Sequence, residues 1–83
     1  MRVGVFSIAS VLIERDEQMA RTVLRECLVV RAEQIFTHKA IDYTALNDAF
    51  DEVPSGEYTP RYSWYFNEDN ILTWHKWANG VKP

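Results

Sequence analysis

The sequence predicts a single small α+β domain over residues 1–83, with two helices packed on one face of a small, mainly antiparallel three-stranded sheet in the order β-α-α-β-β. Three observations predict this fold class. An apolar run opens the chain, a long stretch of helical periodicity follows it, and seven of the eleven aromatic residues lie between Tyr58 and Trp77. Hydrophobic residues make up 47% of the chain, which is enough to form a core at this length.

Residues 2–12 predict the first strand. Apolar side chains occupy both faces of this stretch at period two, which is typical of a central strand covered on both sides. Gly4 disfavours the start of a helix at this point in the chain. The end of the run, from Ser10 to Ile13, also fits the beginning of a helix.

Residues 16–38 predict a long amphipathic helix. Asp16 is a suitable N-cap, acidic residues fill the first turn and His38 stands at the end, a distribution that matches the helix dipole. Apolar side chains recur along one broad arc of this segment at about 100° per residue. We therefore expect one face of this helix to cover the sheet.

Residues 42–53 predict a short second helix with Asp42 as its N-cap. Its apolar side chains recur at spacings of three and four, as the inner stripe of a helix does, at Tyr43, Leu46, Phe50 and Val53. Pro54 lacks a backbone donor and Gly56 permits a positive φ, so we expect the helix to end there.

Residues 58–66 and 71–77 predict a β-hairpin. Both runs are rich in aromatic side chains, and the four residues between them, NEDN, are turn formers. The alternative is a final helix over residues 71–78 with Asp69 as its cap. Threonine and tryptophan in the second run favour the strand.

The length of the turn sets the register of this hairpin. If Phe66 pairs with Ile71, Trp64 falls on the face toward the core and Trp74 falls on the outer face. We expect the outer face to carry a tyrosine, a tryptophan and two basic residues, beside an apolar inner face.

The cysteine content predicts a reducing compartment. Cys27 is the single cysteine, so no intrachain disulfide can form, and we expect a cytoplasmic protein. The apolar run after Arg2 superficially resembles a signal peptide, but its eleven residues are too few to cross a bilayer and pass directly into a helical pattern. We therefore expect no membrane association.

The sequence contains no motif for catalysis, for a metal or for a cofactor. His38 and His75 are the only histidines, and together with Cys27 they do not reproduce the ligand spacing of a zinc site. Glycine-rich phosphate loops and nucleophile-elbow sequences are also missing. The sequence therefore predicts a protein that is not an enzyme and that uses no metal or cofactor.

Acidic residues are concentrated in one window of the chain. Between Asp42 and Asp69 there are seven acids and one base, a net charge of −6, whereas the rest of the chain has a net charge of +3. Such an asymmetry steers association with a basic partner. We expect a partner-binding surface with acids at its rim and tyrosines as anchors, made of Asp42, Asp48, Asp51, Glu52, Glu57, Tyr58, Tyr65, Glu68 and Asp69.

The small size, the acidity, the single domain and the missing catalytic motif together resemble small viral or mobile-element accessory proteins that inhibit host machinery. This resemblance assigns a role to no residue. It implies a non-catalytic protein-binding module, a small acidic inhibitor or regulator that docks on a basic partner such as a nucleic-acid-handling complex.

Two other functions fit the sequence. Aromatic and basic residues alternate along the hairpin, as they do on surfaces that bind single-stranded nucleic acid or small ligands, at Arg61, Tyr62, Trp64, Tyr65, Trp74, Lys76 and Trp77. The acidic window would repel phosphates, which disfavours direct binding of nucleic acid. The other alternative is a structural homodimer packed through the long helix, since dimers often bury surplus apolar surface.

Overall fold

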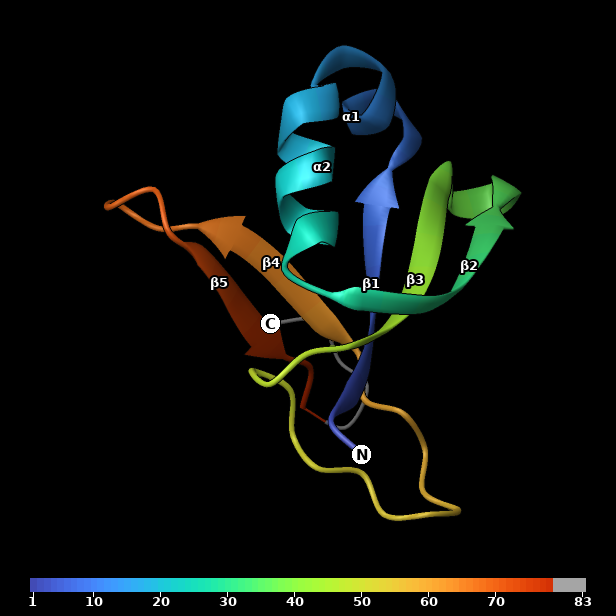
Figure 1. Ribbon diagram of the computed structural model, residues 1–83. Helices are drawn as coiled ribbons and strands as arrows, with labels where there is room; N and C mark the ends of the chain where they lie inside the picture. The colour runs from blue at the N-terminus through green and yellow to red at the C-terminus, as the bar shows by residue number, and fades with distance from the viewer. Residues whose placement is uncertain (79–83) are drawn as a thin grey trace.

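The computed structural model describes residues 1–78 and contains a three-stranded antiparallel sheet, two helices and a two-stranded hairpin (Figure 1). Apart from the short 3₁₀ turn η1, the first five elements run β-α-α-β-β, so the predicted α+β fold class is confirmed. The elements are β1 Val3–Ala9, α1 Ser10–Arg15, α2 Glu17–Arg25, β2 Leu28–Ile35, η1 Phe36–His38, β3 Ala40–Leu46, β4 Tyr62–Phe66 and β5 Leu72–Lys76.

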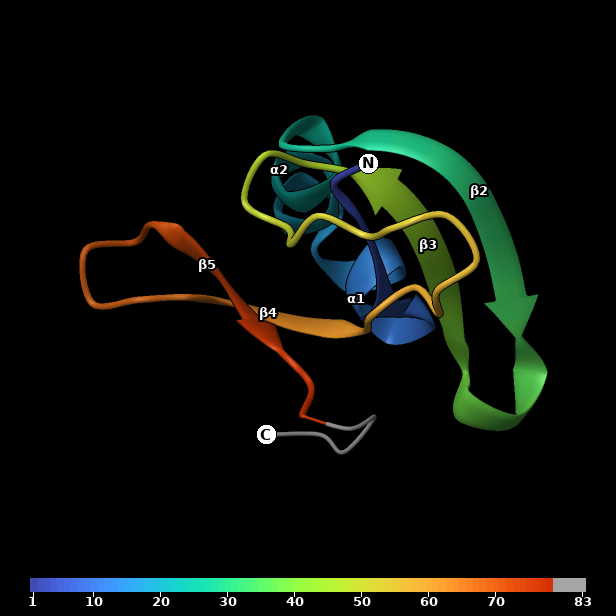
Figure 2. The same ribbon diagram turned by 90° about the horizontal axis from the view of Figure 1, so that it is seen from below.

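The three-stranded sheet has the order β1-β3-β2, with β3 in the centre. Phe6 pairs with Tyr43 on one face of the sheet, while Ser7 pairs with Asp42 on the other face. The two helices lie on the first face, and the sheet curves beside them (Figure 2). Their apolar side chains pack against this face from Leu12, Ile13, Ala20, Val23 and Leu24.

The first strand is shorter than predicted and ends at Ala9. Ser10 N donates to the carbonyl oxygen of Lys39 over 2.8 Å, and α1 begins at Ser10, so the helical alternative for this part of the run is the correct one. The predicted cap of the next helix is confirmed, because Asp16 Oδ1 accepts a hydrogen bond from Met19 N at 3.1 Å.

The predicted long helix over residues 16–38 is wrong beyond Arg25. The next segment, Leu28–Ile35, is the strand β2, which pairs with β3 apart from one bulge. Asn47 Nδ2 donates to the carbonyl oxygen of Glu26 over 3.0 Å and satisfies an acceptor at the helix end. The two adjacent valines of β2 favour a strand, and pairing with a distant segment overrides the local helical periodicity.

The predicted short helix over residues 42–53 is wrong, because Ala40–Leu46 forms the central strand β3. Tyr43 and Ala45 are buried on the helix-covered face, and Thr44 between them points to the opposite face. Phe50 is also buried, but it lies in the loop after the strand rather than on a helical stripe. The apparent helical spacing therefore combined residues of two different elements.

The hairpin lies within the two predicted ranges, and the alternative helix over residues 71–78 is wrong. Its register differs from the prediction by one residue, because Phe66 pairs with Leu72. Asn67 N donates to the carbonyl oxygen of Ile71 over 3.0 Å, and Asn70 takes a left-handed φ of 60°, which leaves a three-residue loop.

This shift of register exchanges the two faces of β5. Trp74, predicted on the outer face, is half-buried and packs against the core, with its ring centroid 5.0 Å from that of Phe6 and 5.0 Å from that of Phe50. His75, predicted on the core face, is exposed. A slip of one residue moves every side chain of a strand to the other face, which accounts for both differences.

The hairpin joins the sheet at the β1 edge. Val5 N donates to the carbonyl oxygen of Pro60 over 2.9 Å, and Val5 forms a parallel bridge with Arg61 just before β4 begins. From there the hairpin extends away from the sheet on the side opposite β2 (Figures 1 and 2). No helix within residues 1–78 has the length and apolar character needed to cross a membrane.

Candidate functional site

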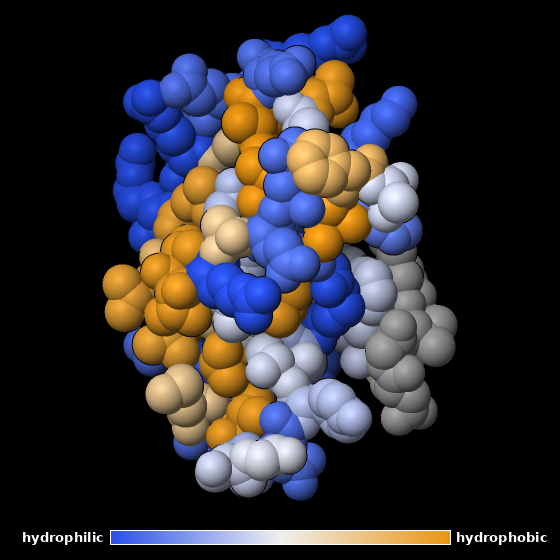
Figure 3. Space-filling view, turned by 90° about the vertical axis from the view of Figure 1, so that its right-hand side faces the viewer, coloured by the Kyte–Doolittle hydropathy of each residue, from blue (hydrophilic) through white to orange (hydrophobic). Residues whose placement is uncertain are grey.

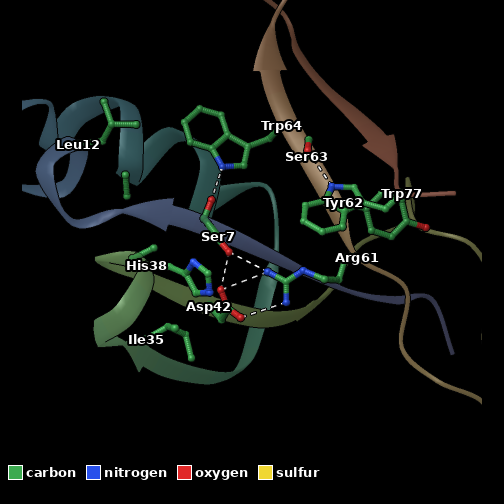
Figure 4. Close-up of a pocket in the computed structure, with 12 residues that line it drawn as sticks. Ser7, Leu12, Ile35, His38, Asp42, Arg61, Tyr62, Ser63, Trp64 and Trp77 are labelled. Atoms are coloured by element: carbon green, nitrogen blue, oxygen red, sulfur yellow. Dashed lines mark hydrogen bonds and ion pairs between the residues drawn. The ribbon is translucent and has the colours of Figure 1, made fainter. Parts of the chain in front are cut away.

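An open cavity of about 760 Å³ lies beside the face of the sheet that carries Ser7 and Asp42, at the start of the hairpin, and Leu12 of α1 also lines it. Strands β1 and β3 supply its floor, and β4, η1 and the segment after β5 supply its walls (Figure 4). Its lining residues are Ser7, Ala9, Leu12, Ile35, His38, Ala40, Asp42, Arg61, Tyr62, Ser63, Trp64 and Trp77.

A hydrogen-bonded ion pair stands at the centre of this cavity. Arg61 Nη1 lies 3.1 Å from Asp42 Oδ2, and Arg61 Nη2 donates to Ser7 Oγ over 2.9 Å. The hydroxyl of Ser7 donates in turn to Asp42 Oδ1. The register that places Ser7 opposite Asp42 brings the two side chains together, and the chain entering β4 adds the guanidinium.

Two tryptophans fix the position of this network. Trp64 Nε1 donates to the carbonyl oxygen of Ser7 over 2.8 Å, which ties β4 to β1. Trp77 Nε1 donates to Ser63 Oγ over 2.8 Å, and its ring centroid lies 5.1 Å from Arg61 Cζ, within the range of a cation–π contact. The two indoles therefore present apolar ring surface around a fixed charged pair.

The environment of Asp42 favours its charged form. Burial by itself raises the pKa of Asp42, but hydrogen bonds from Arg61 and Ser7 and the charge of Arg61 outweigh this effect and lower the pKa. The charge of His38, whose ring lies beside Asp42 in Figure 4, acts in the same direction. Asp42 therefore acts as the anionic partner of Arg61 at neutral pH.

The serine, histidine and aspartate of the cavity are not arranged for acyl transfer. That chemistry places a base in hydrogen-bond contact with the nucleophile. The hydroxyl of Ser7 instead donates to Asp42, and in the described part of the chain His38 makes no hydrogen bond to Ser7. Residues 1–78 also contain no group of three metal-ligating side chains that could hold an ion.

The loop between β3 and β4 carries most of the predicted partner-binding residues, and its base is fixed. The ring of Phe50 stacks on that of Tyr62 with centroids 4.4 Å apart, and Asp51 N donates to Tyr62 Oη over 2.8 Å. Arg2 Nη1 donates to the carbonyl oxygen of Phe50 over 2.8 Å. Val53 N donates to the carbonyl oxygen of Met1 over 2.9 Å. We call residues 47–58 the acidic loop.

The acidic loop contains four acids and no base, but two of these acids are paired. Asp51 Oδ2 lies 2.9 Å from Lys76 Nζ, and Glu52 contacts the amino group of Met1. Asp48 and Glu57 are exposed and form no ion pair with another residue of the described chain. Tyr58, next to Glu57, is 99% exposed.

The other predicted residues lie apart from this loop. Glu68 and Asp69 stand in the hairpin turn, which both ribbon views place far from the acidic loop (Figures 1 and 2). Tyr65 lies on β4 with its hydroxyl 3.0 Å from His75 Nε2. Asp42 belongs to the cavity network. The structure therefore divides the acidic window of the sequence into three places.

The sequence predicts Asp42 as the cap of a helix. It does not predict the hydrogen bond of Asp42 with Ser7 or its ion pair with Arg61. A signal was present, since Asp42 and Ser7 are polar residues inside two otherwise largely apolar runs. Placing them opposite each other required the register of β1 on β3, which neither run specifies alone.

We compared the chain with models of protein families, with curated proteins and with solved structures, and none of the three comparisons produced a match.

Proposed function

We propose that this protein is a non-catalytic protein-binding module that docks on a basic partner through the acidic loop. The observation that carries the proposal is Tyr58, a large aromatic side chain that is 99% exposed beside Glu57. Aromatic side chains of this kind are common anchors of protein interfaces, because burial of the ring on a partner removes much apolar surface from water.

The fixed base of the loop supports this proposal. The stacked rings of Phe50 and Tyr62 and the hydrogen bond from Asp51 N to Tyr62 Oη hold one side of the loop against the core. A loop whose base is ordered loses less conformational entropy on binding than a free segment does. The loop therefore has the properties of a partly organised recognition element.

The charge of the loop supports a basic partner. Among the described residues Asp48 and Glu57 have no ion-pair partner, whereas Asp51 and Glu52 are already paired. Exposed acids mainly raise the association rate with a basic surface and make that rate sensitive to salt. In this proposal the partner is a nucleic-acid-handling complex of the cytoplasm, which the bound protein inhibits.

The test compares two variants with the same change of charge. Immobilised wild-type protein, D48K/E57K and E68K/D69K are used to capture proteins from a cell lysate, and the captured proteins are identified by mass spectrometry. We expect the wild type and E68K/D69K to capture the same basic protein, and we expect D48K/E57K to lose it. Association of the purified partner should slow by about tenfold in D48K/E57K and depend less on salt.

The variant Y58A separates anchoring from folding. Since Tyr58 is almost fully exposed, its truncation should leave the free energy of unfolding unchanged within about 0.5 kcal/mol, while it weakens binding of the partner. Equal capture by D48K/E57K and the wild type would overturn the proposal. Loss of capture only in E68K/D69K would move the binding site to the hairpin turn.

The cavity supports a second candidate function, the binding of a small ligand. Trp64 and Trp77 supply apolar ring surface around Arg61 and Asp42, a combination that suits a planar ligand with polar edges. Titration with nucleosides, nucleotides and short oligonucleotides should then quench tryptophan fluorescence in the wild type, and the variant W77A should lose the response. Unchanged fluorescence with all of these ligands at low salt counts against this candidate.

A further inference from the structure

The strand β2 forms an unpaired edge of the sheet. Among the described residues it pairs only with β3, whereas the opposite edge, on β1, is partly covered by the segment around Arg61. All residues from Leu28 to Gln34 are exposed. Long exposed edges present free backbone donors and acceptors that can pair with another strand.

We propose that β2 pairs with β2 of a second copy of this chain, antiparallel and about a two-fold axis at Ala32. Pairing about such an axis joins the two sheets into one continuous sheet of six strands, with the helices of both copies on the same face. This interface uses a different surface from the acidic loop and does not depend on the proposed function.

The charges of β2 are complementary to themselves in this register. With Ala32 opposite Ala32 of the second copy, Arg31 stands opposite Glu33 of that copy, and Glu33 stands opposite its Arg31. Moving the axis by one residue toward either end would place Arg31 opposite Arg31 or Glu33 opposite Glu33. Like charges directly opposite each other are unfavourable, so the charges select one register.

The existing ion pair of β2 does not oppose this pairing. Arg31 Nη2 lies 3.1 Å from Glu33 Oε2 of the same strand, and the two side chains are 71% and 55% exposed. An exposed pair of this kind contributes little to stability, so both side chains can turn toward a partner strand at small cost. In the dimer the two pairs would form a network of four charges.

The apolar residues of β2 also fit a two-fold arrangement. They lie at both ends of the strand, with Leu28 and Val30 exposed at the start and Phe36 78% exposed just after the end. Antiparallel pairing about Ala32 brings the start of one copy beside the end of the other, so Leu28 of one copy lies near Phe36 of the other, while Val30 faces Gln34. Figure 3 shows apolar side chains gathered on this side of the molecule, with hydrophilic ones among them.

The bulge of β2 lies outside the segment that carries the charges. The register on β3 shifts between Val29 and Arg31, which leaves the run from Arg31 to Ile35 regular. With the axis at Ala32, the part of this run that is regular in both copies is Arg31 to Glu33, and the bulge beyond it discourages continued stacking of strands. The expected product is therefore a closed dimer rather than a fibre.

The test uses complementary single variants in sedimentation velocity between about 1 and 300 μM, the range of weak dimers. The wild type should dimerise with a micromolar Kd. The variants R31E and E33R should each weaken this dimer by about tenfold or more, because each places like charges opposite each other twice. Mixing R31E with E33R should restore dimerisation as a heterodimer, and the double variant R31E/E33R should again form a homodimer.

A matched control is R21E, which breaks an ion pair of similar exposure with Glu17 on α2 and should leave the dimer unchanged. Circular dichroism of each variant checks that the fold is retained. A wild-type protein that stays monomeric over the whole range overturns the proposal. A dimer that persists equally in R31E and E33R, or a mixture of these two that gains no affinity, also overturns it.

Discussion

The ring of Tyr62 occupies the space that a side chain on Gly4 would need. A Cβ atom at Gly4 would lie 2.7 Å from two ring carbons of Tyr62 and 3.0 Å from the ring of Phe50. The missing side chain at Gly4 thus lets the start of β4 and the acidic loop pack directly on β1.

The variant G4A should therefore lower the free energy of unfolding by about 1–3 kcal/mol, because both rings are buried and have little room to move. Urea denaturation measures this change. The control is G56A, in which the new Cβ has no neighbour within 4 Å and only the positive φ of 88° is unfavourable. A smaller loss in G4A than in G56A would contradict the explanation by close packing.

The ion pair of Asp42 with Arg61 predicts a dependence of stability on pH. Since the pKa of Asp42 is lowered in the folded chain, the charged form stabilises the fold above the ordinary pKa of 3.8, and this contribution is lost as the pH falls below that value. The variant D42N should lose about 1–3 kcal/mol at pH 7, and the difference from the wild type should shrink below pH 4.

The measurement for D42N is the midpoint of thermal unfolding as a function of pH. The variant D48N is the control, because Asp48 is exposed and forms no ion pair within the described residues. Parallel curves for D42N and the wild type down to pH 2 would show that Asp42 does not stabilise the fold through its charge.

The thiol of Cys27 should react slowly in the folded protein. Burial raises the pKa of Cys27 above its ordinary value of 9.0, a hydrogen bond from Asn47 opposes this change and the charge of Glu26 reinforces it. The thiolate is therefore scarce at pH 7.5. A disulfide reagent that releases a chromophore should react more slowly with the native protein than with the same protein in concentrated urea. Equal rates would show that the fold does not protect the thiol of Cys27.

Asn70 should tolerate glycine but not alanine. Its φ of 60° lies in the left-handed region, which asparagine and glycine adopt more easily than other residues. We expect N70A to lose about 1 kcal/mol in thermal unfolding, and we expect N70G to stay within about 0.5 kcal/mol of the wild type. Equal losses in the two variants would show that the side chain of Asn70, and not its backbone conformation, stabilises the turn.

The parts of the fold that depend on residues close together in the sequence could be predicted from it. The cap at Asp16 follows from its position before an amphipathic segment, and it is present in the structure. The end of that helix is not predicted, because the residues after it pair with the distant strand β3 and Asn47, from the loop after β3, binds the carbonyl of Glu26. The spacing of apolar residues along one segment does not indicate contacts with a distant segment.

The central strand β3 shows a different reason for error. The alternation of apolar and polar residues from Ile41 to Ala45 is typical of a strand, but a longer window that included Phe50 matched a helix as well. The cavity could not be predicted, because Ser7, Asp42 and Arg61 belong to three segments. Only the register of β1 on β3 and the path of the chain into β4 bring them together.

The packing of Trp74 on Phe6 has a consequence for the order of events during synthesis. Translation proceeds from the N-terminus, so the first strand leaves the ribosome long before the hairpin that covers it. Until residues 62–74 emerge, Phe6 and Phe50 lack their contacts with the ring of Trp74. The carbonyl oxygen of Ser7, next to the ion pair of Asp42, also lacks its hydrogen bond from Trp64 on β4. The fold can therefore close only late in synthesis, and a nascent chain stalled before the hairpin would expose apolar surface that chaperones bind.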